Sequence, residues 1–316
     1  MFQYIIRRIL IAIPVLFGVT IFNFFIINLA PGNPVDMYLN PDATEADIQA
    51  KKEALGLNDP IYIQYIRWLN NLLHGDFGFS YTTYEPVLDL VVNRIVPTLL
   101  LMGTALLIAY IIAIPIGIIS ATKQYSWMDY LTTTFSFLGV SIPSFFLGLG
   151  AIYVFALVFK ILPTGGMFTL GNEGSFTDTL VHLILPAAIL GTSIAGSTVR
   201  YVRSSMLEVL GQDYLRTARA KGLKEFVVTN KHALKNALIP IITIIGMEIP
   251  VLIGGAVVTE QIFQWPGLGQ LTIQSISSRD YPTLMAINFL AAFAVLFSNL
   301  LTDVLYSVVD PRIKYS

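Results

Sequence analysis

"DYLRTARAKGLKEF", residues 213–226, is a cationic stretch in an otherwise apolar chain. Basic residues stand on both sides of a single glycine, Gly222, and the stretch lies between two long apolar runs, about 181–199 and 239–263. The residues before the glycine are mostly good helix formers, and glycine suits the left-handed position that ends a helix. The pattern therefore predicts a helix, a corner at Gly222 and a second helix, projecting between two membrane spans.

Apolar runs of similar length recur along the 316 residues, of which 55% are hydrophobic and 12% charged. About 20 apolar residues are enough for a helix to cross the hydrocarbon core of a bilayer. Six spans are predicted, at about 9–29, 98–120, 131–159, 181–199, 239–263 and 283–307. The first run is too long for a signal peptide, and Pro31 directly after Ala30 makes a poor cleavage site, so we expect this span to be retained.

The charge of the segments between the runs predicts their orientation. Segment 30–97 has four basic residues against nine acidic ones, a balance of −5, whereas 200–238 has eight basic against three acidic, a balance of +5. Because lysine and arginine stay on the cytoplasmic side, we expect 200–238 inside and 30–97 outside. Six spans then place both termini in the cytoplasm. The predicted fold class is an all-α integral membrane protein with six transmembrane helices.

The outer segment 30–97 is predicted to hold two short helices. Thr44 and Asp47 have the spacing of a capping box at the start of the first helix, and Asp59 is the expected N-cap of the second. The second helix should be amphipathic, since its apolar residues are Ile61, Tyr65, Trp68 and Leu72. We expect both helices on the outer membrane surface, where they serve as a docking platform, as a lid or as a passive decoration.

Several classes of chemistry are excluded or disfavoured. The chain has no cysteine, and its three histidines are far apart in sequence, so no metal site is expected. It also lacks a G-x-x-x-x-G-K-[ST] phosphate loop, so the chain is not expected to be an ATPase, and we predict no catalytic residue and no cofactor. The net charge of −1 gives no indication of nucleic-acid binding.

A few residues inside the apolar runs have two interpretations. Glu248 is a candidate residue of a transport pathway, because a charge in lipid is costly, but it also fits a structural pair with a polar neighbour. The stretch 265–267 indicates a turn with an interfacial aromatic residue. A small-residue stripe, suited to close helix packing within the chain or against a second membrane protein, consists of Ala187, Gly191 and Ala195.

The corner segment also carries a resemblance. "YLRTARAKGL" (214–223) followed by "HALKNALIP" (232–240) resembles the cytoplasmic loop of binding-protein-dependent ABC importer permeases of the peptide and nickel subgroup. "GDFGFSY" (75–81), "GGAVVTEQIFQWPGLGQL" (254–271) and "RDYP" (279–282) match in order, and the resemblance extends over essentially the whole chain. It is closest to the B-type permease of oligopeptide and dipeptide systems.

In that family the loop is a coupling helix that sits in a groove of the ATPase subunit. The residues of this chain that the resemblance assigns to ATPase coupling are Tyr214, Arg216, Thr217, Ala218, Arg219, Ala220, Lys221 and Gly222. The wider family has Glu-Ala-Ala, three residues and then Gly; here Arg216 and Thr217 stand at the first two positions. Individual contacts are therefore carried over only at Ala218 and Gly222. Because Ala218 and Ala220 are small, we expect them to let a partner come close.

The resemblance implies a type I ABC importer fold in three parts. Residues 1–96 form the first span and the extracytoplasmic loop, 97–309 form the transport domain with a coupling loop at 203–238, and 310–316 form a cytoplasmic tail. The implied function is the permease subunit of an ATP-driven importer, which forms half of an alternating-access pathway for oligopeptides or dipeptides.

The implied location is multi-pass, in the cytoplasmic membrane of a bacterium or archaeon. The implied partners are a homologous second permease in a heterodimer, two ATPase subunits, an extracytoplasmic substrate-binding lipoprotein and the lipid bilayer, with no nucleic acid. Three alternatives remain open: the same importer class carrying nickel complexes or sugars, an ion-coupled secondary transporter using Glu248, and a membrane scaffold that transports nothing.

Overall fold

The computed structural model is almost entirely helical. It describes residues 2–29, 35, 44–238, 240–241, 244, 246, 248 and 256–309. The elements in chain order are α1 (Phe2–Leu29), α2 (Glu45–Ala54), α3 (Ile61–Leu73), α4 (Val87–Thr122), α5 (Trp127–Ser141), α6 (Ser144–Ala151), the π-helix η2 (Ile152–Val158), α7 (Phe176–Leu210), α8 (Asp213–Ala220), α9 (Glu225–Val227), the π-helix η3 (Val228–Ala233), α11 (Val257–Ile262), α12 (Leu268–Ser278) and α13 (Tyr281–Val309).

Four helices in the described part of the chain are long and apolar enough to cross a membrane: α1, α4, α7 and α13. The expected span 131–159 is not one straight helix, because α5 and the α6–η2 pair meet at an angle of 93°. Pro143 causes this break, since proline forces the residue before it, Ile142, into an extended conformation (φ −84°, ψ 123°). About half of the expected span 239–263 lies outside the described residues.

The centre of the bundle is the long contact between α4 and α7. The small-residue stripe on α7 faces α4, and a Cβ added at Gly191 would lie 2.8 Å from the carbonyl oxygen of Ala105. Ala187 and Ala195 are buried in the same contact. The stripe therefore serves packing within the chain, one of the two alternatives that its sequence allowed.

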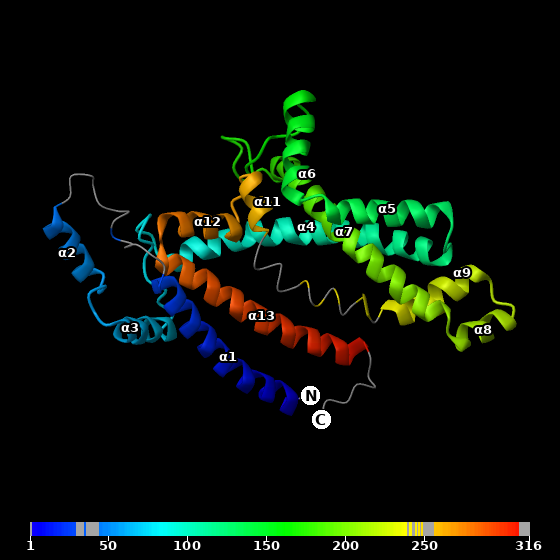
Figure 1. Cartoon of the computed structure of the whole chain (residues 1–316), viewed down its shortest axis with the longest axis horizontal. Helices are drawn as coiled ribbons and strands as arrows, with labels where there is room; N and C mark the ends of the chain where they lie inside the picture. The colour runs from blue at the N-terminus through cyan, green and yellow to red at the C-terminus, as the bar shows by residue number, and fades with distance from the viewer. Residues whose placement is uncertain are drawn as a thin grey trace.

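α1 and α13 lie side by side, and α3 packs across one end of both (Figure 1). Phe24 of α1, Tyr65 of α3 and Met285 of α13 form one buried cluster, and the Tyr65 hydroxyl lies 3.0 Å from Thr20 Oγ1. The apolar face predicted for the second outer helix is confirmed, and it covers other helices of the same chain.

The ends of the two outer helices confirm one expectation and correct another. The capping box is present, since the Thr44 N–H donates to Asp47 Oδ2 (2.9 Å) and the Asp47 N–H donates to Thr44 Oγ1 (3.3 Å). Asp59 is not the N-cap of α3: Pro60 occupies that position, with no side-chain cap. The Asp59 carboxylate instead accepts a hydrogen bond from the Arg67 guanidinium, 2.7 Å away. This carboxylate therefore binds Arg67 and does not cap the helix.

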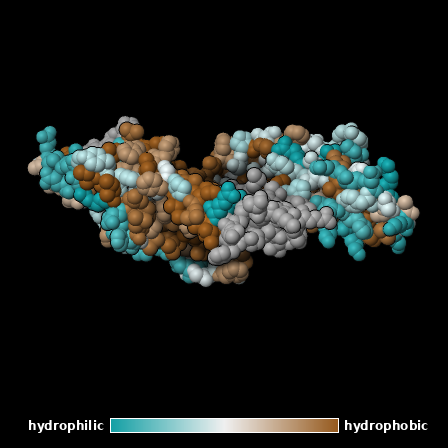
Figure 2. Space-filling model, turned by 90° about the horizontal axis from the view of Figure 1, so that it is seen from below, coloured by the Kyte–Doolittle hydropathy of each residue, from teal (hydrophilic) through white to brown (hydrophobic). Residues whose placement is uncertain are grey.

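The two polar segments lie at opposite ends of the molecule's long axis. Figure 1 shows α2 and α3 at one end and α8 and α9 at the other. On the face drawn in Figure 2, hydrophobic residues gather between these ends, and hydrophilic residues concentrate toward both. This is the arrangement that a membrane-spanning bundle with one polar segment on each side requires.

Candidate functional site

The corner at Gly222 has the geometry that the sequence predicts. α8 ends at Ala220, Gly222 has a φ of +79°, and α9 begins at Glu225 and continues into η3. The Gly222 N–H donates to the Arg219 carbonyl (2.9 Å) and the Leu223 N–H to the Ala218 carbonyl (3.4 Å). These two bonds form a Schellman motif, which satisfies the last carbonyls of α8 while the chain turns.

The inner face of α8 rests on the transmembrane bundle. Leu215 is fully buried, and Ala218 is 8% exposed. Their common cluster, which links α8 to α4, α7 and η3, includes Ala121, Val202, Met206, Val228, Ala233 and Ala237. The expectation that Ala218 offers close approach to a partner is therefore wrong, because this small side chain lets α8 pack against its own bundle. Ala220 is exposed, as expected.

The outer face of α8 and its corner is cationic and open. The Arg216 side chain is 85% exposed, and its weak contact with Asp213 spans 3.7 Å between two exposed groups. Lys221 and Lys224 are also exposed, and so is Phe226, at 76%. Phe226, in α9, lines a pocket with Ile114 and Ile118 of α4, so the cationic surface consists of Arg216, Lys221 and Lys224. Exposed cations of this kind are suited to a protein partner with acidic groups.

Two polar contacts hold the corner segment in shape. The Tyr214 hydroxyl accepts from Asn236 Nδ2 at 2.9 Å, which ties α8 to the helix that leads to the next span. Arg219 forms a two-pronged ion pair with Glu225 across the corner, with distances of 2.7 Å and 3.1 Å. The hydrogen bonds of this pair lower the pKa of Glu225 and raise the pKa of Arg219.

Sequence reasoning missed a buried ion pair at the root of the segment. Arg203, counted as one cation among several, donates to both carboxylate oxygens of Asp129 at 2.8 and 2.9 Å. Asp129 is only 4% exposed, and it also accepts from the Ser120 hydroxyl. The signal available in the sequence was Asp129 itself, an isolated acid just before an apolar run.

A second missed carboxylate lies near the other end of α4. Glu260 has no exposed surface, and it accepts from the Thr98 hydroxyl (3.1 Å) and the Gln270 N–H (3.0 Å). Trp265 nearby is also fully buried, with its indole N–H donating to the Pro97 carbonyl at 2.9 Å. The expected interfacial aromatic at 265–267 is therefore wrong, because the indole finds its hydrogen-bond partner inside the protein.

Glu248 lies apart from the coupling residues, in the segment of which few residues are described. It is partly buried and lies within electrostatic range of the hydroxyl of Tyr110 in α4. That hydroxyl is buried and lacks a hydrogen-bond partner among the described residues. Within the same part of the chain, no cluster of histidine, aspartate and glutamate is arranged to hold a metal ion.

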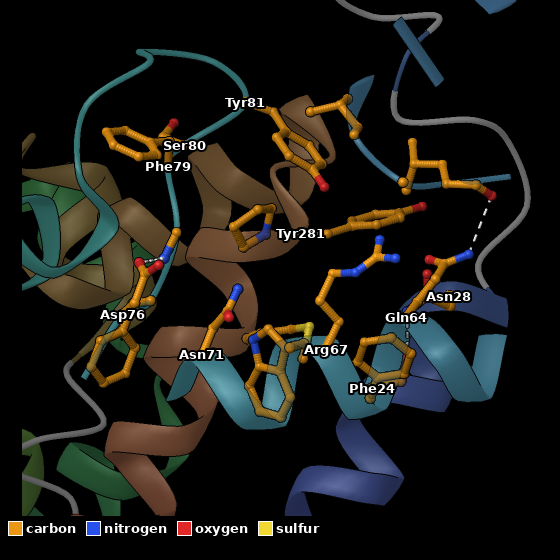
Figure 3. Close-up of a pocket in the computed structure, with 18 of the residues that line it drawn as sticks. Phe24, Asn28, Gln64, Arg67, Asn71, Asp76, Phe79, Ser80, Tyr81 and Tyr281 are labelled. Atoms are coloured by element: carbon orange, nitrogen blue, oxygen red, sulfur yellow. Dashed lines mark hydrogen bonds between the residues drawn. The ribbon is translucent and has the colours of Figure 1, made fainter. Parts of the chain in front are cut away.

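At the opposite end from α8, the structure forms a pocket of about 340 Å³ between α1, α3, α13 and the loop around residues 76–81. Arg67, Tyr81 and Tyr281 point into it (Figure 3). The loop is held by Asp280, which accepts from the Tyr81 N–H at 3.0 Å and from the Ser80 hydroxyl. The outer segment thus contributes a fixed, partly aromatic surface.

Known proteins resemble this chain along its whole length. The family model of the "Binding-protein-dependent transport system inner membrane component" matches residues 113–315, and the N-terminal model of the same kind matches 1–102. The oligopeptide transport system permease protein AppB of Bacillus subtilis is 49% identical over 316 residues, all of both chains. The dipeptide transport system permease protein DppB of Alkalihalophilus pseudofirmus is 42% identical over the full length of both chains.

The glutathione transport system permease protein GsiC of Escherichia coli is 39% identical over all of both chains. Among solved structures, the inward-facing MetNI methionine ABC transporter contains a chain with a TM-score of 0.57 and 18% identity. The match covers 72% of this chain and 99% of that one, so it shows a shared fold. The chain belongs to the family of inner-membrane components of binding-protein-dependent transport systems, the multi-pass permease subunits of ABC importers.

Proposed function

We propose that this permease forms half of a pathway for oligopeptides or dipeptides, and that α8 with its Gly222 corner is the coupling element that contacts an ATPase subunit. The observation that carries the second part is the division of α8 into two faces. Leu215 anchors one face of α8 in the transmembrane bundle, while Arg216 on the same helix is exposed, as are Lys221 and Lys224 around the corner. The names of the full-length relatives support the peptide cargo.

Each coupling residue has a role that depends on whether its side chain is exposed or buried. Arg216, Lys221 and Tyr214 contact the ATPase, Gly222 sets the direction of the chain, and Arg219 keeps the corner closed through Glu225. Among the remaining coupling residues, Thr217 and Ala220 belong to the contact surface, and Ala218 packs α8 against the transmembrane bundle.

The topology that fits this function has six spans and both termini in the cytoplasm. Residues 1–96 contribute the first span and the outer loop, 97–309 the transport domain, and 310–316 the tail. The positions of α2–α3 and α8–α9 at opposite ends of the long axis support an outer and an inner segment (Figure 1). A homologous second permease completes the pathway, two ATPases drive it, and a substrate-binding protein delivers cargo from outside.

Alternating access explains how such an assembly works. ATP binds more tightly to the state in which the ATPases are closed together, so it shifts the equilibrium toward that state. The movement carries α8 inward and opens the outer side, and hydrolysis resets the cycle. Glu248 is proposed to line the pathway, where it would attract the amino group of a peptide.

Transport by purified components tests the proposal. The permease pair is reconstituted with the ATPases and the binding protein, and uptake of a labelled peptide is measured with ATP or with a proton gradient alone. Uptake that requires both ATP and the ATPases supports the proposal. Uptake driven by the proton gradient without ATPases indicates an ion-coupled carrier. ATP-driven uptake of nickel complexes or sugars in place of peptides would overturn the proposal that the cargo is a peptide.

A further inference from the structure

The buried pair Arg203–Asp129 joins three helices where the corner segment leaves the bundle. Arg203 lies on α7, which ends at Leu210, and Asp129 lies in the first turn of α5. The Asp129 carboxylate accepts two bonds from Arg203, one from the Ser120 hydroxyl of α4 and one from the Tyr125 N–H at 3.0 Å. Both carboxylate oxygens are thus fully used, which fixes the angle between the helices as well as their distance.

The pair is adjacent in sequence to residues that pack against α8. Val202 precedes Arg203 on α7, and Ala121 follows Ser120 on α4. Both flanking residues belong to the cluster that buries Leu215 of α8. Because protein interiors are closely packed and transmit displacement, a force on α8 reaches the ion pair through this cluster and the adjoining backbone of α7 and α4.

From the pair, α5 continues along α7 in close contact. A Cβ added at Gly196 of α7 would lie 2.9 Å from the carbonyl oxygen of Ser136 on α5, and the Arg200 guanidinium lies 5.4 Å from the ring centre of Phe137. α5 then turns by 93° into α6 and η2, which Figure 1 shows pointing away from the α4–α5–α7 layer. The Arg203–Asp129 ion pair therefore connects the helices next to α8 to α5 and, through α5, to α6 and η2.

Stability alone is a poor reason for such a pair, because apolar residues of similar size often stabilise a buried site equally well. The two-pronged geometry of this arginine–carboxylate contact does, however, specify the relative position of the two helices that carry it. Three further arginine–carboxylate pairs in the described part of the chain are more exposed: Arg67–Asp59, Arg216–Asp213 and Arg219–Glu225. Arg203–Asp129 differs from them because its carboxylate is buried at a junction of spans, while the Arg203 side chain is 27% exposed.

We propose that Arg203 and Asp129 are positioning residues that make α5, and with it α6, move as one body with α7 when the ATPase displaces α8. The proposal rests on the proposed contact between α8 and the ATPase. The proposal about Arg203 and Asp129 concerns how the movement passes through the permease. It can therefore fail while the contact between α8 and the ATPase holds, and the contact can fail on its own.

The first test uses Asp129→Asn in the complete transporter in proteoliposomes. Asparagine keeps the size of the side chain but removes the charge that Arg203 requires. We expect the peptide transported per ATP hydrolysed to fall by about twofold to thirtyfold, the range typical of changes within a coupling network, while a cross-linker at position 216 still captures the ATPase. The matched change Asp178→Asn, in the first turn of α7 at the end away from α8, should leave the ratio unchanged.

Arg203→Lys separates coupling from folding. It keeps the positive charge but cannot form the two-pronged contact, so we expect a normally assembled transporter with an intermediate ratio. An unchanged ratio in Arg203→Lys and Asp129→Asn, with the cross-link intact, would overturn the proposal. If Asp129→Asn does not assemble, Arg203→Lys alone decides.

The second test measures the movement itself and does not depend on the cross-link. Tyr130 on α5 is 63% exposed and Tyr201 on α7 is 55% exposed, and the absence of native cysteine permits a spin label at each. In the otherwise native permease, the distance between the labels should be the same without nucleotide and with ATP bound, and Asp129→Asn should make it nucleotide-dependent. A nucleotide-dependent distance with Asp129 in place would overturn the proposal. A missing cross-link with a constant distance would instead overturn only the α8 contact.

Discussion

A graded series at Gly222 tests the corner most selectively. Gly222 has a φ of +79°, and a Cβ added there meets no atom within 4 Å. The cost of a side chain at this position therefore comes from the backbone conformation alone, with no contribution from a clash. Asparagine tolerates the left-handed conformation, alanine costs about 1–2 kcal/mol there, and a β-branched valine costs more.

This cost translates into a predicted loss of coupling. A penalty of about 1–2 kcal/mol reduces the population of the correct corner by a factor of roughly 5–30 if the whole penalty acts on that equilibrium. Leu215 anchors α8 from within, so the spans themselves should remain folded. We expect ATP-coupled transport to decrease in the order Gly, Asn, Ala, Val, while the amount of purified permease stays constant.

Transport per ATP hydrolysed, measured in proteoliposomes with the ATPases and binding protein, gives the readout. Gly211→Ala is the matched control, because Gly211 lies in the same segment but has a φ of −78°, which alanine adopts without strain. Valine transporting as well as this control would refute the role of the corner. Asparagine and valine being equally impaired would show that φ is not the cause.

Other predictions follow from the same geometry. Arg219 lowers the folded-state pKa of Glu225, so the pair stabilises the corner above the ordinary pKa near 4.5 and loses this effect as the pH falls through the lowered value. The amides of the corner, corrected for intrinsic exchange, should therefore lose protection from hydrogen exchange below about pH 4.5. Glu225→Gln should abolish this pH dependence. Leu215→Ala, at a fully buried position, should destabilise the packing of α8 by about 2–5 kcal/mol, seen as faster amide exchange throughout α8; unchanged exchange would contradict the described burial. A single cysteine at Lys51 should react with an impermeant reagent from outside whole cells and one at Lys224 should not, whereas the reverse pattern would invert the topology.

Local patterns could be predicted from the sequence wherever one short-range rule decides the structure. Gly222 ends α8 because the left-handed position favours glycine, and Thr44 with Asp47 form a capping box because their spacing places each side chain on the other's N–H. The apolar face of α3 followed from helical periodicity. These features depend on a few neighbouring residues.

Tertiary partners could not be predicted in the same way. Asp129 and Arg203 are 74 residues apart, and nothing in either local sequence indicates the other. Trp265 was expected at an interface, but its partner is the carbonyl of Pro97, 168 residues away. Ala218 illustrates the same limit, since a small residue suits the surface of a partner as well as the chain's own core, and only the packed structure distinguishes the two.

The most direct test of the central claim is site-specific photo-cross-linking from the exposed side of α8. A photoreactive amino acid at position 216, whose arginine side chain is 85% exposed, is compared with one at Glu53 in α2, near the opposite end of the molecule. In the assembled transporter, we expect position 216 to capture the ATPase subunit in a nucleotide-dependent manner and position 53 not to capture it. Capture of lipid alone at position 216 during ATP turnover would contradict the claim.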